Sequence, residues 1–369
     1  MPTFDPTRFI NTNPTEVSEE VYTPKHTFNT FGLHPRIAHS VQELGLTTPT
    51  PIQDKVIPLI LTSNDVVGLA ETGTGKTAAF LLPLIHKTIQ DSWRQTLILA
   101  PTRELAVQIE KELKSLTKKM NIYSVVCVGG TGIGPQIKKL HNRNHFVIGT
   151  PGRILDLINR KKFNVRDIST VVLDEADRML DMGFIHDIRS ILKSTPRDRE
   201  TLFFSATIDK NTESLVSEFM QNPITVSVKK KDVTNSIEQD VVKHGRDNKF
   251  NTLVNLLDDD SFKRIIVFGN MKHKVQKLAN ELDSRGIKSE SIHGNKTHGQ
   301  RQRALAKFKS GNARVLVATD VAARGIHVDN VSHVINYDLP STFEDYVHRI
   351  GRTGRSDKRG KALTFVSGK

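Results

Sequence analysis

The chain has 369 residues, of which 37% are hydrophobic and 25% charged, and its formal net charge is +13. This length favours two domains, and the composition favours soluble, globular cores over a membrane-spanning chain, since no apolar run approaches the roughly 20 residues that cross a bilayer. The excess of lysine and arginine favours a polyanionic partner, nucleic acid first, over a role in solubility alone. One cysteine excludes an intramolecular disulfide and a cysteine metal site, so we expect a reducing, cytoplasmic setting.

The first residues, 1–25, are polar and without hydrophobic period, so we expect a flexible N-terminal arm. Short apolar runs then alternate with helical patterns, which is typical of a parallel sheet covered on both faces. We expect a first domain over 26–226, with strands at 65–70, 96–100, 123–130, 145–150, 169–174 and 201–207, and helices at 76–89 and 103–116.

The alternation breaks near three consecutive lysines, 229–231, and we interpret 227–240 as a linker. A second series of α/β elements follows, with strands predicted at 264–270, 288–294, 313–320 and 331–339, and helices at 272–286 and 300–311. The predicted fold class is therefore α/β, with a second domain over 241–369 and an interdomain cleft. Ligands of such sheets bind at the carboxyl ends of the strands.

The stretch GLAETGTGKT lies between a predicted strand and a predicted helix, the context that favours a phosphate-binding loop over a flexible turn. Gly73 and Gly75 allow the backbone amides to turn toward phosphate oxygens. Lys76 supplies a positive charge, and the Thr77 hydroxyl can ligate Mg²⁺. The general pattern has glycine at position 70, but Ala70 requires only a negative φ there.

A carboxylate pair follows the apolar run at 169–173, which predicts that Asp174 lies at a strand tip. There Asp174 can hold Mg²⁺ through water, and Glu175 can orient or deprotonate an attacking water. Near the C-terminus, HRIGRTGR offers Arg349, Arg352 and Arg355 as arginine fingers, which would require domain closure to act. A solvated basic loop, or one that contacts nucleic-acid phosphates, explains these arginines equally well.

These segments, in this order, resemble the DEAD-box family of ATP-dependent RNA helicases in superfamily 2, from about Phe28 to the C-terminus. GLTTPTPIQ resembles the Q motif, AETGTGKT motif I, DEAD motif II and SAT motif III. IVFGN resembles motif IV, ATDVAARGIHV motif V and HRIGRTGR motif VI. PTREL, a glycine pair and TPGR resemble the RNA-backbone motifs of the first domain.

The resemblance implies two RecA-like domains that bind ATP with Mg²⁺ and hold single-stranded RNA across both, with little sequence read. The catalytic residues would be Lys76, Asp174, Glu175, Arg352 and Arg355, with Thr77 and Asp174 holding the metal largely through water. The nucleotide would contact Phe28, Gln53, Ala70, Thr72, Gly73, Thr74, Gly75, Lys76, Thr77 and His327. Asp177, Ser205, Thr207 and His348 would couple hydrolysis to unwinding. RNA would contact Pro101, Thr102, Arg103, Gly130, Thr150, Arg153, Gly269, Asn270, Arg301, Thr319 and Arg324.

Three positions depart from the family pattern. His327 stands where the family usually has an aspartate that contacts the ATP ribose, so we expect His327→Asp to tighten ATP binding. His298 replaces a glutamine, for which Gln300 could substitute. The chain ends at KALTFVSGK, before a helix that family members usually have, so we expect the second domain to be truncated.

The predicted activity is an RNA-dependent ATPase that unwinds short RNA duplexes or remodels RNA–protein complexes. An ATP-gated RNA clamp with slow turnover has the same motifs and stays an alternative. The Q motif and the DEAD and SAT sequences disfavour a DNA helicase, and Gln53, placed for adenine, disfavours a GTPase. We expect a monomer that does not contact a membrane. Protein partners in an RNA–protein complex are compatible with this expectation.

Overall fold

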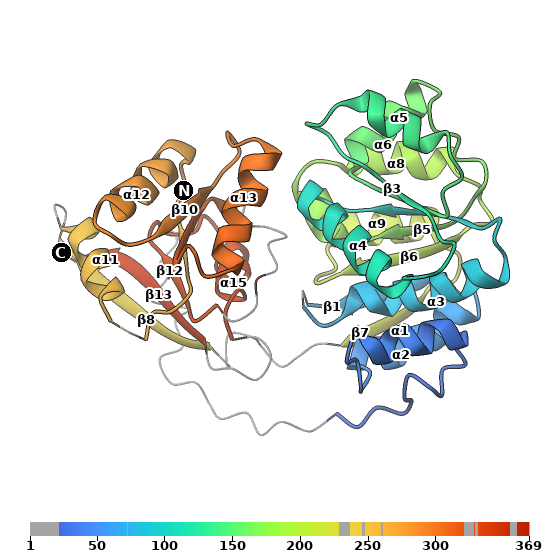
Figure 1. Ribbon diagram of the computed structural model, residues 1–369, viewed down its shortest axis with the longest axis horizontal. Coiled ribbons are helices and arrows are strands. Elements are labelled where there is room, and N and C mark those ends of the chain that lie inside the picture. The colour runs from blue at the N-terminus through green and yellow to red at the C-terminus, as the bar shows by residue number, and fades with distance from the viewer. Residues whose placement is uncertain are drawn as a thin grey trace. The chain divides into compact units, whose positions relative to one another are not determined.

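The computed structural model describes residues 22–71, 73–228, 237–245, 248–259, 261–320, 328, 331–354 and 360–368, with only the backbone of His298 and Glu344. These residues form two compact units, one from residues 20–230 and the other from 231–369, and each is described by itself. Figure 1 shows an α/β arrangement in both. No helix among the described residues has the length and apolar character to cross a membrane.

The first unit contains a seven-stranded sheet in which every pair of neighbours is parallel, in the order β3-β4-β2-β5-β6-β1-β7. The strands are β1 Val66–Ala70, β2 Gln95–Leu99, β3 Ser124–Cys127, β4 Phe146–Gly149, β5 Ile168–Leu173, β6 Glu200–Ser205 and β7 Ile224–Val228. The helices are α1 Pro35–Glu43, α2 Pro51–Leu61, α3 Lys76–Gln90, α4 Arg103–Leu116, α5 Ile133–Leu140, α6 Pro151–Asn159, α7 Ala176–Asp181, α8 Ile185–Ser194 and α9 Lys210–Phe219.

Alternate residues of each strand enter two separate cores, because successive side chains point to opposite faces of a sheet. Val66 and Ile98 pack with α1 to α4, whereas Val67 and Leu97 pack with α6 to α9. Figure 1 shows α1, α2 and α3 together along one side of this sheet. Both faces are therefore covered, which explains the near-continuous apolar character of the central strands.

The second unit contains a six-stranded parallel sheet in the order β10-β11-β9-β12-β13-β8. Its strands are β8 Ile237–His244, β9 Ile265–Phe268, β10 Ser289–Ile292, β11 Val315–Ala318, β12 His333–Asn336 and β13 Gly360–Ser367. Its helices are α11 Lys249–Leu257, α12 Lys272–Ser284, α13 His298–Lys309 and α15 Phe343–Ile350. The predicted α/β fold class with a mainly parallel sheet in each half is confirmed, and each strand and helix named from the sequence is present.

The expected linker at 227–240 is wrong at both ends. Residues 227–228 belong to β7, which pairs with β1, and residues 237–240 belong to β8, which pairs with β13 along its whole length. Both are edge strands whose side chains are alternately buried and exposed. Glu238 and Asp240 face solvent from within the sheet, whereas Gln239 is buried and accepts a hydrogen bond from Tyr346, so a polar composition alone did not reveal these strands. Residues 229–236 lie outside the described part of the chain.

The expected flexible arm at 1–25 also extends too far, because residues 22–25 contact the first unit. The buried carboxylate of Asp54 accepts hydrogen bonds from Tyr22 Oη (2.5 Å), Lys25 N (3.0 Å) and His26 N (2.9 Å). Desolvation would raise the pKa of Asp54, but these donors outweigh it and hold the pKa below its usual value. The four residues from Tyr22 are thus bound to α2 by an aspartate that the sequence reading did not single out.

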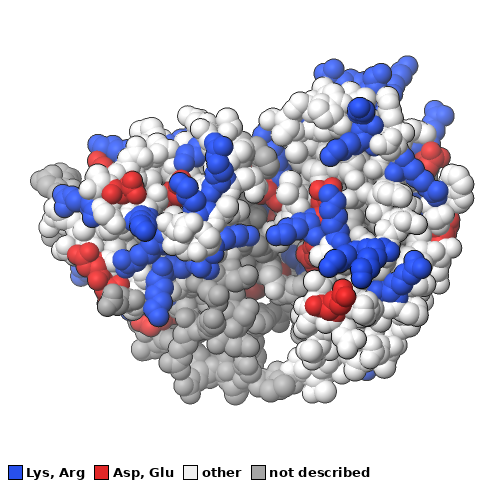
Figure 2. All heavy atoms as spheres, in the orientation of Figure 1, with Lys and Arg blue, Asp and Glu red and all other residues white. Residues whose placement is uncertain are grey.

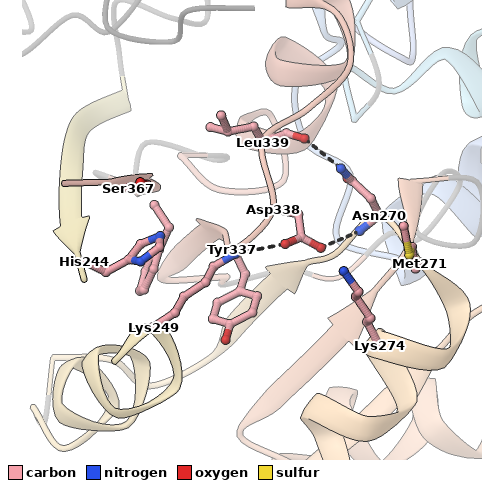
Figure 3. A pocket seen from close by; sticks show the side chains of 10 residues that line it. His244, Lys249, Asn270, Met271, Lys274, Tyr337, Asp338, Leu339 and Ser367 are labelled. Atoms are coloured by element: carbon pink, nitrogen blue, oxygen red, sulfur yellow. Dashed lines mark hydrogen bonds and ion pairs between the residues drawn. The ribbon is translucent and has the colours of Figure 1, made fainter. Parts of the chain in front are cut away.

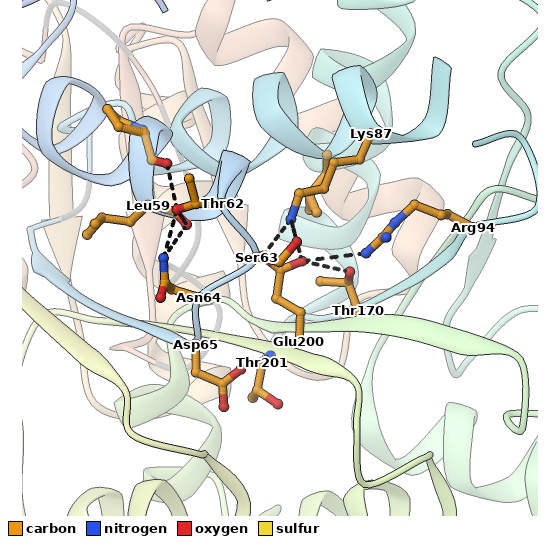
Figure 4. A network of polar contacts seen from close by, with 12 residues as sticks. Leu59, Thr62, Ser63, Asn64, Asp65, Lys87, Arg94, Thr170, Glu200 and Thr201 are labelled. Atoms are coloured by element: carbon orange, nitrogen blue, oxygen red, sulfur yellow. Dashed lines mark hydrogen bonds and ion pairs between the residues drawn. The ribbon is translucent and has the colours of Figure 1, made fainter. Parts of the chain in front are cut away.

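A buried ion pair joins α3 to β6 on the side of the sheet where the strands begin (Figure 4). Lys87 Nζ lies 2.9 Å from both Glu200 carboxylate oxygens and donates to Ser63 Oγ at 3.0 Å. Thr170 Oγ1 on β5 donates to Glu200 at 3.1 Å, and Arg94 lies 3.8 Å away. Desolvation raises the pKa of Glu200 and lowers that of Lys87, so each charge depends on its partner.

We predict that Glu200→Ala destabilises the first unit by about 3–5 kcal/mol, because it leaves the Lys87 ammonium buried without its counter-charge. Glu218→Ala is the matched control, because its pair with Arg189 lies at the surface and should contribute less than about 1 kcal/mol. Urea denaturation of the full chain checks both values. Adding Lys87→Met to Glu200→Ala should recover part of the lost free energy of unfolding. Equal destabilisation by Glu200→Ala and Glu218→Ala would contradict the view that the Lys87–Glu200 pair acts as a buried ion pair.

Candidate active site

The order of the strands in the first sheet sorts the predicted site residues into two neighbouring groups. The glycine loop, DEAD and SAT follow β1, β5 and β6, which are adjacent in the order β5-β6-β1. PTREL, the glycine pair and TPGR follow β2, β3 and β4, which are adjacent in the order β3-β4-β2. All strands are parallel, so their carboxyl ends share one edge, with the predicted nucleotide residues along one half and the predicted RNA residues along the other.

The glycine loop has the backbone conformation that its two glycines permit. Gly73 and Gly75 have φ values of 86° and 87°, and a Cβ on Gly75 would lie 2.5 Å from Gln53 Nε2. Ala70 ends β1 and is not among the positive-φ residues, so alanine is unstrained there. Lys76 Nζ donates to the Ala70 carbonyl at 2.6 Å, which holds the ammonium over the loop. The Thr74 hydroxyl donates to the Glu71 carbonyl at 2.8 Å.

Asp174 lies at the carboxyl end of β5, where its backbone N donates to Leu99 O on β2 at 3.0 Å. Its side chain is buried, and Oδ1 has no hydrogen-bond partner among the residues that the structure describes. Burial raises the pKa of Asp174 to about 7, with the nearby charge of Lys76 opposing that rise. An orphaned buried carboxylate oxygen is the group that a hard divalent cation would satisfy, so Asp174 and the half-buried Thr77 fit a Mg²⁺ site.

No cluster of three or more histidine, cysteine or acidic side chains suited to hold a metal occurs among the described residues. Mg²⁺ commonly binds through one or two carboxylates and completes its coordination with water and phosphate oxygens, which suits Asp174 beside the Thr77 hydroxyl. Desolvation, then the charge of Asp174, raises the pKa of Glu112 on α4 to about 7. The helical pattern of α4 gave no signal of this shift.

Glu175 follows Asp174 in a left-handed conformation with φ of 52°, at the N-cap position of α7. Its side chain is buried, and Oε2 accepts a hydrogen bond from Arg178 Nη1, three residues later. A non-glycine residue at positive φ is uncommon and occurs often at functional sites. Sequence reasoning missed Arg178, although its position in the first turn after DEAD was the available signal.

Asp177 links DEAD to SAT through hydrogen bonds between the two strand ends. Its Oδ2 accepts from Ala206 N at 2.9 Å and from Thr207 N at 3.0 Å, and lies 3.3 Å from the Thr207 hydroxyl. Asp177 N in turn donates to Ser205 Oγ at 3.3 Å, and that hydroxyl donates to Thr207 O at 2.7 Å. A movement of either loop must break these hydrogen bonds or move the other loop with it. The DEAD and SAT segments are therefore mechanically joined.

The predicted adenine residues lie beside the loop. Gln53 Nε2 donates to Gly75 O at 3.1 Å, and Gln53 Oε1 accepts from Thr50 N at 3.0 Å, so the amide is oriented from both ends. Phe28 is only 5% exposed and packs edge-on against Phe31, with ring centroids 6.1 Å apart. A ring so covered offers little face to a base, so stacking by Phe28 stays a prediction.

Among the predicted RNA residues, Arg103 and Gly130 form one unit. Arg103 begins α4, and its guanidinium lies against Gly130, which has a φ of 70°. A Cβ on Gly130 would lie 1.8 Å from Arg103 Nη1, so only glycine accommodates this arrangement. The guanidinium is thereby held at the carboxyl ends of β2 and β3.

Two helices begin at the same edge of the sheet and point their N-termini toward it. Thr102 is the N-cap of α4, and its hydroxyl accepts from Leu105 N at 3.2 Å. Thr150 is the N-cap of α6, and Arg153 in the first turn donates to Thr131 O at 3.2 Å. Pro101 is buried beside Thr102. Helix N-termini with arginines nearby favour the binding of phosphate groups.

In the second unit, Arg349 is buried with its donors engaged inside the unit, which disfavours the arginine-finger interpretation that the sequence left open for it. Its guanidinium is 1% exposed and donates to both carboxylate oxygens of Asp320, at 2.6 and 2.7 Å. It also donates to Asp338 O at 2.6 Å and to Asn270 Oδ1 at 2.9 Å. With its donors engaged inside the unit, Arg349 joins the segments after β9, β11 and β12.

Asn270 has both ends of its side-chain amide engaged, since Nδ2 donates to Leu339 O at 3.0 Å (Figure 3). Its backbone N donates to Asp338 Oδ2, and Lys249 Nζ lies 2.9 Å from Asp338 Oδ1. These contacts border a pocket of about 380 Å³ at the carboxyl ends of β8, β13, β12 and β9. Asn270 therefore fits a positioning role better than direct RNA contact through its side chain.

The other predicted residues of the second unit lie in separate segments. Gly269 N donates to Ala318 O at 3.0 Å, and Thr319 N to Ile292 O at 3.2 Å, at neighbouring strand ends. Arg352 is buried, and its Nε donates to His348 O at 3.3 Å. Arg301 lies on α13. The predicted residues Thr72, Arg324, His327 and Arg355 lie outside the described part of the chain.

Basic side chains dominate the view in Figure 2, where lysines and arginines gather over α4 and α5 of the first unit and over α12 and α13 of the second. Acidic side chains are sparse in the same areas. This distribution matches the net charge of +13 and favours a polyanionic partner for both units.

We predict that Gly130→Ala weakens single-stranded RNA binding by about tenfold, because the new Cβ displaces the Arg103 guanidinium and with it a charged hydrogen bond to phosphate. ATP binding should be retained, since its residues follow other strands. Gly134→Ala is the matched control, because a Cβ there meets nothing within 4 Å. Fluorescence anisotropy with labelled RNA measures both; equal affinity of the two variants would remove Arg103 from the RNA site.

Family models match both halves of the chain: the model "DEAD/DEAH box helicase" over residues 50–215 and "Helicase conserved C-terminal domain" over 248–357. The ATP-dependent RNA helicase CshA of Listeria monocytogenes is 49% identical over 341 residues, 92% of this chain and 66% of that protein. CshA of Bacillus subtilis is 46% identical over 343 residues, 92% of this chain and 69% of that protein.

The chain thus spans about two thirds of the length of these relatives. Among solved structures, Dbp5 of S. cerevisiae bound to RNA and ADP BeF3 is similar with a TM-score of 0.82 and 31% identity, covering 93% of this chain and 90% of that one. Both units are accordingly RecA-like. The chain belongs to the DEAD-box family of ATP-dependent RNA helicases.

Proposed function

We propose that the chain is an RNA-dependent ATPase that binds single-stranded RNA across both units and uses ATP to unwind short duplexes or remodel RNA–protein complexes. The observation that supports this most directly is the sorting of residues along one sheet edge. A loop built for phosphate, an orphaned carboxylate and the DEAD–SAT bonds follow three adjacent strands. Arginines and helix N-termini follow the three next to them.

The residues around the loop would bind and orient the nucleotide. Lys76, now bound to the Ala70 carbonyl, would exchange that weak neutral partner for the β- and γ-phosphates. Thr77 and Asp174 would hold Mg²⁺, which when bound neutralises charge on the phosphates. Gln53, oriented from both ends of its amide, would read the adenine edge.

Glu175 would accept the proton of the attacking water, since its left-handed backbone aims the carboxylate from the end of β5. Arg178 donates to that carboxylate and holds its orientation. Arg352 and Arg355 of the second unit would stabilise the charge of the transition state when the units close. Arg349 is not among these candidates, because its donors are engaged with Asp320 and its neighbours.

Hydrolysis would be coupled to RNA through the Asp177 bonds. The loss of the γ-phosphate beside Asp174 and Glu175 would shift DEAD, and Asp177 would transmit this movement to Thr207. His348 would contribute from the second unit, and His327 would contact the ribose more weakly than a carboxylate. An ATP-gated clamp would use the same bonds with slower turnover.

RNA as the substrate is supported by the basic surfaces of both units and by the RNA that Dbp5, the solved relative, binds. We expect the chain to be a cytoplasmic monomer. We also expect it to bind RNA with little sequence specificity, because helix N-termini and arginines recognise phosphate rather than bases. The chain would also contact protein partners within an RNA–protein complex.

We predict that Glu175→Gln retains the binding of ATP and RNA but loses at least about 10²-fold in ATP hydrolysis, the contribution typical of a general base. Multiple-turnover phosphate release with and without single-stranded RNA measures the rate, and equilibrium binding of an ATP analogue measures the affinity. Lys76→Ala is the contrasting variant and should lose nucleotide binding itself.

A strand-displacement assay beside the ATPase assay separates helicase from clamp, since a clamp binds RNA in an ATP-dependent way without displacing a strand. A wild-type rate in Glu175→Gln would show that another group takes the proton. An ATPase rate that RNA leaves unchanged in the unaltered chain would contradict the proposed function as a whole.

A further inference from the structure

Trp93 is the single tryptophan of the chain, and it lies on the surface of the first unit with 82% of its area exposed. It sits in the turn from α3 to β2, where its backbone N donates to Asp91 Oδ1 at 3.0 Å. Arg94 N donates to Asp91 O at 3.2 Å and closes the same turn. An indole so exposed contributes little to the core, since tryptophan stabilises a fold by the area it buries.

Arg143 holds the indole in place from the turn before β4. Its guanidinium carbon lies 4.5 Å from the Trp93 ring centroid, a cation–π contact on one face of the ring. Its Nη2 donates to the Ser92 carbonyl and lies 3.2 Å from the Ser92 hydroxyl. The guanidinium is thus held by both the indole and Ser92. The part of the ring that Arg143 does not cover remains open to a ligand.

A second aromatic pair stands beside the first. Tyr123 is 54% exposed and stacks on His145, with centroids 5.7 Å apart and planes at 20°. Tyr123 N donates to His145 Nδ1 at 3.0 Å. Tyr123 directly precedes β3, His145 directly precedes β4 and Trp93 lies just before β2. Because these three strands are neighbours, the two pairs lie along the amino-terminal edge of the sheet.

The charge around these rings is positive. The segments that lead into β3 and β4 carry exposed Lys118, Lys119, Lys138, Lys139 and Arg143. The acidic residues at this edge are fewer: Asp91 accepts from the Trp93 amide, Glu110 pairs with Lys114 and accepts from Ser124 Oγ, and Asp167 precedes β5. Cations interleaved with exposed rings favour single-stranded nucleic acid, whose phosphates bind the cations while its bases stack on the rings.

We propose that Trp93, Arg143 and Tyr123, the last stacked on the buried His145 and together here called the Trp93 strip, form an accessory surface for single-stranded RNA. The inference rests on the proposed function, that the chain binds RNA. The Trp93 strip lies at the amino-terminal ends of β2, β3 and β4. Arg103, Gly130 and Arg153 follow the carboxyl ends of the same strands, about 15 Å away for strands of this length. RNA that leaves the main path around the edge strand β3 would reach it within several nucleotides, with a base stacked on the open face of Trp93.

The single tryptophan makes the test site-specific. The full chain is titrated with oligoadenylate RNA of about 15 nucleotides, and tryptophan fluorescence and its quenching by acrylamide are recorded. We expect RNA to quench the fluorescence and to protect it from acrylamide, since Trp93 is 82% exposed without RNA. RNA stimulation of ATP hydrolysis is measured on the same samples.

Trp93→Ala should weaken the binding of this RNA by at least about fivefold, the loss of one stacked base, with basal ATP hydrolysis unchanged. Trp93→Phe keeps a stacking ring and should restore most of the affinity. Ile224→Ala, which truncates an exposed side chain on β7 at the other edge of the sheet, is the matched control and should leave the affinity unchanged.

Unchanged tryptophan fluorescence in the presence of RNA that stimulates ATP hydrolysis overturns the Trp93 strip and leaves the proposed function intact. RNA that neither stimulates hydrolysis nor changes the fluorescence overturns both. Protection of Trp93 by an acidic protein but not by RNA would also overturn the proposal, because it would assign the strip to another class of partner.

Discussion

Parallel strands that share a register end along one edge of their sheet, and the site depends on this constraint. β1 pairs with β6 from Val66 and Leu202 to Leu69 and Ser205, so the glycine loop and SAT leave the sheet side by side. Asp174 is fixed there by its bond to Leu99 O on the neighbouring β2. Residues more than 100 positions apart in the chain thereby converge without any contact specific to a ligand.

Buried charges at this edge are held by partners that also restrict their roles. Asp177 is bound to the SAT backbone, Arg178 to Glu175 and Lys76 to a carbonyl, so each is oriented before a ligand arrives. Arg349 illustrates the opposite outcome, since its bidentate pair with Asp320 uses the donors that a finger would need. A buried arginine with satisfied donors stabilises its surroundings, whereas catalysis needs a donor that is available.

The amino-terminal edge of the first sheet has a different chemistry. The Lys87–Glu200 pair is enclosed there and anchors α3 to β6, while Trp93, a few residues along the chain from Lys87, is exposed. One edge of the sheet therefore carries the polar groups that we propose bind phosphate, and the other combines a buried structural ion pair with an exposed aromatic and basic strip. Both follow from the same alternation of helix and strand.

The fold class, the central strands and the residue types that follow each of them could be predicted from the amino-acid sequence alone. Apolar strands followed by glycine, lysine and carboxylate residues have a pattern that depends on local spacing, and local spacing is visible in a chain. The edge strands β7 and β8 were read as linker, because alternating burial leaves polar residues in them and only pairing with β1 and β13 defines them as strands.

Which charged residues are held by neighbouring groups could be seen only in the folded structure. Arg349 and Arg352 lie in one motif, yet only the contact with Asp320 reveals that the first is structural. Glu112 and Asp54 gave no separate signal, and the position of Arg178 directly after DEAD did not reveal its partner, because these roles come from neighbours far apart in the chain or across a helix turn. Spacing determines which residue types follow a strand, whereas burial and hydrogen bonding, which depend on the whole fold, determine what each one can do.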